Sequence, residues 1–114
     1  MDKNTKYTQY LNISRYILDL NDISPYSKMI LAYIESFYNK PGKVFNCSNN
    51  FISKELNIPI TTVKRCLNEL LTHNHIIIDY TAHNWGKSNR IIYSSEIVAI
   101  DKALKQFKEK YGPK

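Results

Sequence analysis

The sequence predicts a mainly helical protein with one small β-hairpin, an α+β fold built as a single domain over residues 1–114. Apolar residues recur at helical spacing in several separate stretches. Two short runs rich in β-branched residues, 76–80 and 90–93, are separated by a polar segment, as in a hairpin. A chain of 114 residues can bury one hydrophobic core, and a second independent domain would not fit.

The first 23 residues are expected to form an N-terminal arm, a brief strand near Tyr10 to Ile13 and a short helix. A longer helix should begin after Ser24, because serine caps free backbone amides and Pro25 is tolerated in a first helical turn. The Lys40-Pro41-Gly42 segment should end it.

Two further helices complete the helical part of the expected core, which spans residues 24–93. Ser48 can cap the first, and Asn57 can adopt the left-handed conformation that a tight exit needs. The second should run from Ile60 to His73, and Asn74 should end it as Asn57 ends the first.

Residues 94–114 are expected to form a C-terminal helix with an apolar stripe. Its apolar residues follow a 3-4-3-4 spacing, which is typical of helices that pair. The stripe either packs back on its own domain or joins two copies into a homodimer. Its members are Ile97, Ile100, Leu104, Phe107 and Tyr111.

The charge balance indicates a polyanion as partner. Lys and Arg total 16 against 10 Asp and Glu, which gives a net charge of +6. A general bias of the chain toward Lys, Asn, Ile and Tyr would raise the charge without any functional demand. The N-terminus lacks a secretory signal and no apolar run nears the roughly 18 residues of a membrane span, so we expect a cytoplasmic protein without membrane contact.

The segment Ile52-Ser53-Lys54-Glu55-Leu56-Asn57-Ile58-Pro59-Ile60-Thr61-Thr62-Val63-Lys64-Arg65-Cys66-Leu67-Asn68-Glu69-Leu70 resembles a winged helix-turn-helix domain. Upstream, Tyr10-x-x-Ile13 and Ile23-Ser24-Pro25-x-x-Lys28-x-x-Leu31 are similar to the N-terminal domain of plasmid and phage replication initiators. The resemblance implies binding of double-stranded DNA, with the helix from Ile60 inserted into the major groove.

On that helix, residues off the apolar stripe are candidate DNA contacts. Hydroxyls near a helix N-terminus suit phosphate oxygens, and longer polar side chains can extend to base edges. The alternative is a solvated face, with Arg65 paired to Glu69 at the i+4 position. The candidates are Thr61, Thr62, Lys64, Arg65 and Asn68.

The hairpin loop, or wing, offers cations among small and hydrogen-bonding residues, as expected of a loop that lies on the DNA backbone or in the minor groove. Trp85 would equally well pack over the hairpin or the C-terminal helix. Lys3 and Lys6 could form a basic arm or simply a frayed end. The candidates in the wing are Asn84, Trp85, Lys87, Ser88 and Arg90.

No motif of a catalytic site is present, so we expect no enzyme activity and no cofactor. Cys47 and Cys66 lack metal-ligand spacing, and no metal site is expected. The predicted function is sequence-specific DNA binding for a plasmid or phage, in transcription control, replication initiation or conjugative transfer. The alternative is a protein-interaction module built on a winged helix.

Overall fold

The structure of the protein, a computed structural model, describes residues 11–39, 44–80, 83–84, 87–88 and 90–111. For residues 83, 84, 87, 88 and 111 it describes the backbone alone. Over these ranges the helices are α2 (Arg15–Leu18), α3 (Pro25–Phe37), α4 (Asn49–Leu56), α5 (Ile60–Thr72) and α6 (Ser95–Tyr111), and the strands are β1 (Ile76–Asp79), β2 (His83–Asn84), β3 (Lys87–Ser88) and β4 (Ile91–Ser94).

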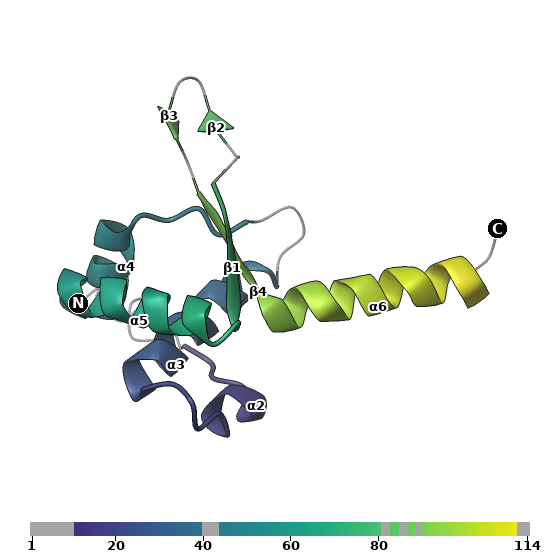
Figure 1. Ribbon diagram of the computed structural model, residues 1–114, viewed down its shortest axis with the longest axis horizontal. Coiled ribbons are helices and arrows are strands. Elements are labelled where there is room, and N and C mark those ends of the chain that lie inside the picture. The colour runs from purple at the N-terminus through teal and green to yellow at the C-terminus, as the bar shows by residue number, and fades with distance from the viewer. Residues whose placement is uncertain (1–10, 40–43, 81–82, 85–86, 89, 112–114) are drawn as a thin grey trace, which may run out of the picture.

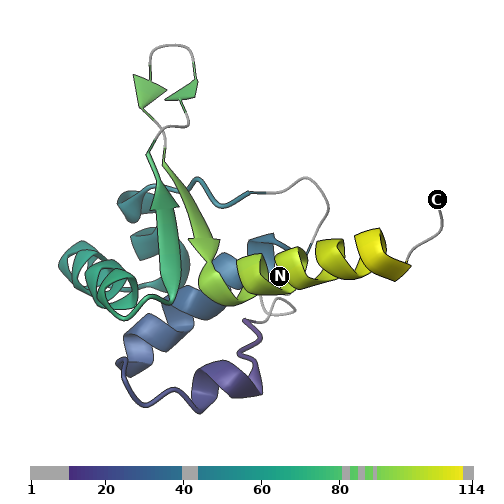
Figure 2. The same ribbon diagram turned by 45° about the vertical axis from the view of Figure 1, so that its right-hand side comes forward.

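Figure 1 shows three parts: a cluster of helices, a hairpin that rises from it, and α6, which extends away on its own. Within the cluster α5 packs on α3 and α4, and the β1–β4 hairpin joins α5 and α3 on one side. The turned view in Figure 2 keeps the hairpin and α6 as separate projections. The winged helix-turn-helix fold class predicted from the sequence is therefore confirmed.

The N-terminal part differs from the prediction. Residues 11–13 form no strand, and Tyr10 lies outside the described residues. Leu11 and Ile13 instead pack against the core as partly buried side chains. A segment with strand-forming residues becomes a strand only where a neighbouring strand can pair with it. Without such a strand, the apolar side chains of this segment are more stable when they cover the core.

The core lies between α3, α5 and the inner face of the hairpin. Met29 and Phe51, which helical spacing places on apolar stripes, are less deeply buried than Leu31 and Ala32 of α3, and Phe51 is exposed. Leu71 of α5 is also exposed, at 40% of its surface. The largest fully buried side chains are Phe45, Ile17, Ile30, Leu31, Ile34, Ile52, Ile58, Leu70, Ile76, Ile92, Val63 and Cys66.

Local sequence signals set the starts of α3 and α4 and the exits of α4 and α5 as predicted. α3 itself ends at Phe37, before the Lys40-Pro41-Gly42 segment that was expected to end it, and that segment lies outside the described residues. Ser24 and Ser48 cap α3 and α4 by accepting hydrogen bonds from the backbone amides of Ser27 and Phe51. Asn57 has a φ of 55° and Asn74 a φ of 63°, both in the left-handed region. The turn at Asn57 allows α5 to begin at Ile60, immediately after α4, at a fixed angle to it.

The hairpin contains two successive pairs of strands instead of the single pair that the sequence predicted. β1 pairs with β4 in antiparallel register, with Ile77 opposite Tyr93, and β2 pairs with β3 nearer the tip. Phe45 forms a β-bridge with Ile92, so the segment before α4 adds to the sheet. The Tyr38 hydroxyl donates to the Ile92 carbonyl at 2.6 Å and accepts from the Phe45 amide at 3.1 Å, which fastens this junction.

A carboxylate joins α5 to the N-terminus of α3. Glu69 accepts hydrogen bonds from the Ser24 amide and the Ser24 hydroxyl, both at 3.0 Å, and from the Ser27 hydroxyl. These bonds, led by the one from the Ser24 amide, hold the pKa of Glu69 below its ordinary value. The negative charge also lies at the positive end of the α3 dipole, so α5 is attached to α3 by charge as well as by packing.

Adjacent leucines near the end of α5 test the packing. Leu70→Ala should lower the free energy of unfolding by about 2–5 kcal/mol, because it leaves a cavity in the core. Leu71→Ala is the matched control and should change the free energy of unfolding by less than about 1 kcal/mol, since 40% of the Leu71 surface is exposed whereas Leu70 is fully buried. Denaturant titration measures both, and equal losses would contradict the register of α5.

The pH dependence of stability tests the Glu69 contact. Because the folded pKa lies below the ordinary 4.5, the carboxylate stabilises the fold above about pH 4.5, and this contribution is lost as the pH falls through the lowered pKa. Glu69→Gln should therefore cost about 1 kcal/mol at pH 7. At pH 3 the variant and the parent should differ less. An equal difference at both pH values would contradict the contact.

Candidate nucleic-acid interface

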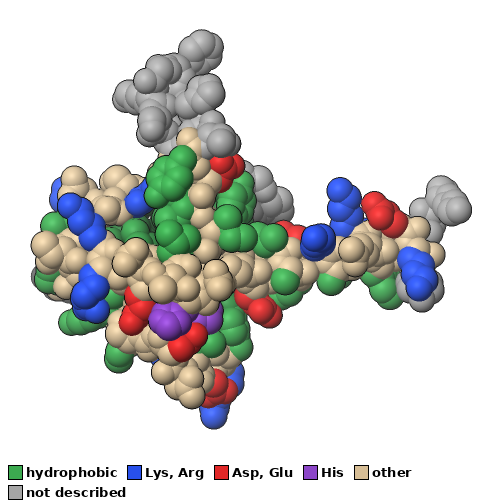
Figure 3. Space-filling view, in the orientation of Figure 1, with side chains coloured by type: hydrophobic (Ala, Val, Ile, Leu, Met, Phe, Trp, Pro, Cys, Tyr) green, Lys and Arg blue, Asp and Glu red, His purple; other side chains and the backbone are tan. Residues whose placement is uncertain are grey.

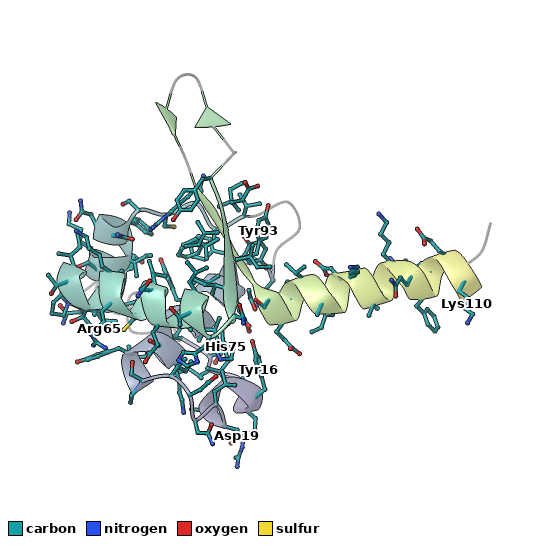
Figure 4. The ribbon with its side chains drawn as sticks, in the orientation of Figure 1. Tyr16, Asp19, Arg65, His75, Tyr93 and Lys110 are labelled. Atoms are coloured by element: carbon teal, nitrogen blue, oxygen red, sulfur yellow. The ribbon has the colours of Figure 1, made fainter. Side chains whose placement is uncertain are left out.

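One face of α5 is exposed, polar and cationic. At 100° per residue, Thr61, Lys64, Arg65 and Asn68 fall on one side of the helix, and all four are exposed. Thr62 is half-buried and lies at the margin of this face. Figure 3 shows Lys and Arg side chains gathered over the end of the molecule that α4 and α5 form in Figure 1, and Figure 4 labels Arg65 on this end of α5.

A hollow of about 180 Å³ lies where α5 meets the base of the hairpin. It brings two of the predicted α5 contacts, Lys64 and Asn68, together with Arg90 at the foot of the wing. Asn49 from the start of α4 and Tyr80, directly after β1, also line it, and the three apolar residues there are Leu67, Leu71 and Ile78. Among the described residues that line it there is no carboxylate, so the hollow is suited to an anion such as a DNA phosphate.

Arg90 has a structural role that the sequence did not indicate. Its guanidinium donates to the Cys47 carbonyl at 3.3 Å and to the Asn49 side-chain oxygen. Burial lowers the pKa of Arg90, but an arginine remains charged at any ordinary pH. Arg90 therefore ties the foot of the wing to the start of α4 while its charge remains in the hollow, and this anchoring role adds to the predicted DNA contact.

The alternative role of Arg65, an ion pair with Glu69, is not seen in the structure. Among the residues that the structure describes, the ion pairs within 4.0 Å involve Asp19 and Asp22, and Glu69 is held by the start of α3. Arg65 lowers the pKa of Glu69 only as the last of several causes. Arg65 thus remains exposed on the α5 face, on the flank opposite to Lys64.

Several predicted contacts lie beyond what the structure describes. Lys3, Lys6 and Trp85 are outside the described residues. Asn84 belongs to β2, and Lys87 and Ser88 form β3, but their side chains are not described. The backbone places these three at the outer end of the hairpin, away from the helices (Figure 1).

Sequence inspection missed Asn49 and Tyr80 as part of this surface. Tyr80 is 67% exposed, although it directly follows β1 and carries a large ring. The one available signal for Asn49 was its place directly after the Ser48 cap, where free helix amides and polar side chains face outward.

Two histidines just after the end of α5 contact the carboxylate of Asp22. His75 Nε2 lies 3.0 Å from a carboxylate oxygen of Asp22, and His73 Nδ1 lies 3.8 Å from the same oxygen. The hydrogen bond from His75 is the main reason that the pKa of Asp22 is lowered. Within the described ranges no cluster of three residues of metal-ligand type occurs, and no helix there is long and apolar enough to cross a membrane.

A comparison with protein families matches residues 20–76 to a family described as a helix-turn-helix domain. The matched half of the chain runs from the turn before α3 to the first residue of β1 and includes the whole exposed face of α5. Searches among curated proteins and among solved structures gave no match.

Arg90 and Lys64 should separate anchoring from binding. Arg90→Ala should lower the free energy of unfolding by about 1–2 kcal/mol, because it leaves the Cys47 carbonyl and the Asn49 side chain without their donor. Lys64→Ala removes an exposed cation and should leave the free energy of unfolding within about 0.5 kcal/mol. Thermal unfolding followed by circular dichroism measures both variants. An Arg90→Ala variant with the same free energy of unfolding as the parent would contradict the anchoring role.

Proposed function

The chain belongs to the helix-turn-helix domain family. Because the helix-turn-helix is a DNA-binding motif, we propose that the protein recognises a specific sequence in double-stranded DNA. In this proposal α5 enters the major groove with Thr61, Lys64, Arg65 and Asn68 toward the bases and the flanking phosphates. The hairpin lies along the neighbouring backbone. The function is one of binding, without a catalytic step.

The observation that carries the proposal is the convergence of Lys64, Asn68 and Arg90 on one hollow between α5 and the hairpin. An α-helix about 10 Å across fills the major groove, so the phosphates at the edge of the groove must run along the side of the helix. The hollow lies on such a side of α5, with α5 as one wall and the foot of the hairpin as the other. A phosphate there would meet two cations and an amide side chain.

The biological setting that we propose is transcription control, replication initiation or conjugative DNA transfer in a plasmid or phage. The reason for proposing this setting is the set of motifs between residues 10 and 31 that resemble those of replication initiators, whereas the family comparison supports a helix-turn-helix domain alone. Transcription control needs only a sequence-specific contact, which the exposed side chains of α5 supply.

A homodimer is also part of the proposal. α6 extends away from the domain, and most of its apolar stripe is not covered by the domain's own helices (Figures 1 and 2). Two copies joined by a two-fold axis would contact two half-sites of a palindrome.

Selection from random duplex DNA, followed by a salt titration on the selected sequence, tests the function. We expect a motif to be enriched, with a log–log slope of affinity against salt of about −4 to −5 if about five phosphates are contacted. Weak binding that enriches no sequence would overturn the proposal and favour a protein-interaction module.

Arg65→Ala tests the face of α5. It should weaken binding by about 1–3 kcal/mol if Arg65 contacts a base, or reduce the salt slope by about one if it contacts a phosphate, with thermal stability unchanged in both cases. Lys105→Ala on α6 is the matched control, because it removes the same charge from an exposed helix position outside the interface. Equal effects of the two variants would indicate a general charge effect and contradict a specific contact.

A further inference from the structure

The apolar stripe of α6 changes from half-buried to exposed along the helix. Ile97 is half-buried next to β4, whereas Ile100 is 49% exposed, Leu104 53% and Phe107 60%. Every described side chain from residue 99 to residue 110 is exposed. Of the two alternatives for this stripe, packing back on its own domain therefore holds only for the first turn of α6.

The spacing of the stripe fits another helix better than a flat surface. Apolar residues that alternate three and four positions apart form the seam of a left-handed coiled coil, in which each side chain enters a hole on the facing helix. α6 has 17 residues, so it carries two such repeats over roughly 25 Å. A seam this short is expected to give a weak dimer by itself.

The charges beside the seam differ between the two halves of α6. Glu96 and Asp101 flank the first half, and Lys108 and Lys110 flank the second half. An acidic half and a basic half on one helix are complementary to the same helix in the opposite direction. The occupant that these charges match is a second copy of this chain.

We infer that two copies pair through antiparallel α6 helices, with Leu104 of each packed against Phe107 of the other and Asp101 of each beside Lys108 of the other. In a parallel pair, Asp101 would instead lie beside Glu96 of the second helix, where like charges repel. Shifting the antiparallel pair by one repeat would place the two Asp101 side chains opposite each other. Charge thus selects both the direction and the register.

The pairing sets the distance between the two domains. With Leu104 opposite Phe107, the first residues of the two helices lie roughly 30 Å apart along the axis, and the domains occupy opposite ends. That distance is close to one turn of B-DNA, about 34 Å. The inference deepens the proposed homodimer but does not rest on DNA binding.

Two charge reversals test the arrangement by sedimentation equilibrium without DNA, at protein concentrations of roughly 100 µM, which detect dissociation constants of the same order. Asp101→Lys and Lys108→Asp should each weaken the dimer by about tenfold, because each puts like charges together at two symmetric places. An equimolar mixture of the two variants should restore association, since every such pair is then of opposite charge.

Matched controls lie on the outer face of the same helix. Glu109→Lys and Lys102→Asp make the same charge changes away from the seam and should leave the dimer unchanged. Circular dichroism should show unaltered helix content, since all four side chains are exposed.

Three results would overturn the inference: a monomer at every concentration, single variants that dimerise as well as the parent, or a tighter dimer with Asp101→Lys, which a parallel pair requires. A monomer that still selects a DNA motif would overturn the pairing and leave the proposed function intact. A dimer that selects no DNA motif would support the pairing and overturn the proposed function.

Discussion

The position of α5 depends on the contact between the Glu69 carboxylate and the first turn of α3. Three donors at the start of α3, the amide and hydroxyl of the capping Ser24 and the hydroxyl of Ser27, converge on one carboxylate oxygen. This contact satisfies helix donors that would otherwise lack partners. It also occupies the nearest acid to Arg65 on α5, so that the cation stays on the outer face.

The hairpin is held by a similar use of polar groups at the edge of the core. The Tyr38 hydroxyl bridges Phe45 and Ile92, and Arg90 connects the start of β4 with the segment before α4. Ser94 donates to the Glu35 carboxylate at 2.6 Å, and Tyr16 donates to the same oxygen. Burial and this bond raise the pKa of Tyr16, so the phenol stays protonated as a donor.

Features with local causes could be predicted from the sequence. Ser24, Ser48, Asn57 and Asn74 act on backbone groups within a few residues, so their identity was enough to place the helix ends. The exposed face of α5 followed from helical periodicity alone.

Features that join distant segments could not be predicted. Arg90 and Asn49 are 41 positions apart, and Ser24 and Glu69 are 45 apart. Spacing along α5 offered Arg65 as the partner of Glu69, but a helix N-terminus brought in by the fold provides more donors. The expected strand at residues 10–13 had the right composition without a neighbouring strand to pair with, so its apolar side chains pack on the core instead.

The junction between β4 and α6 has no intervening residue: β4 ends at Ser94 and α6 starts at Ser95. The Ser95 amide donates to the His75 carbonyl at 2.9 Å, and the Ser94 hydroxyl accepts from the Ile97 amide at 3.4 Å. Because hydrogen bonds on both sides of this junction restrict bending, a change in the direction of α6 would also change the direction of the hairpin. A partner that fixes the direction of α6 would therefore also fix the orientation of the wing.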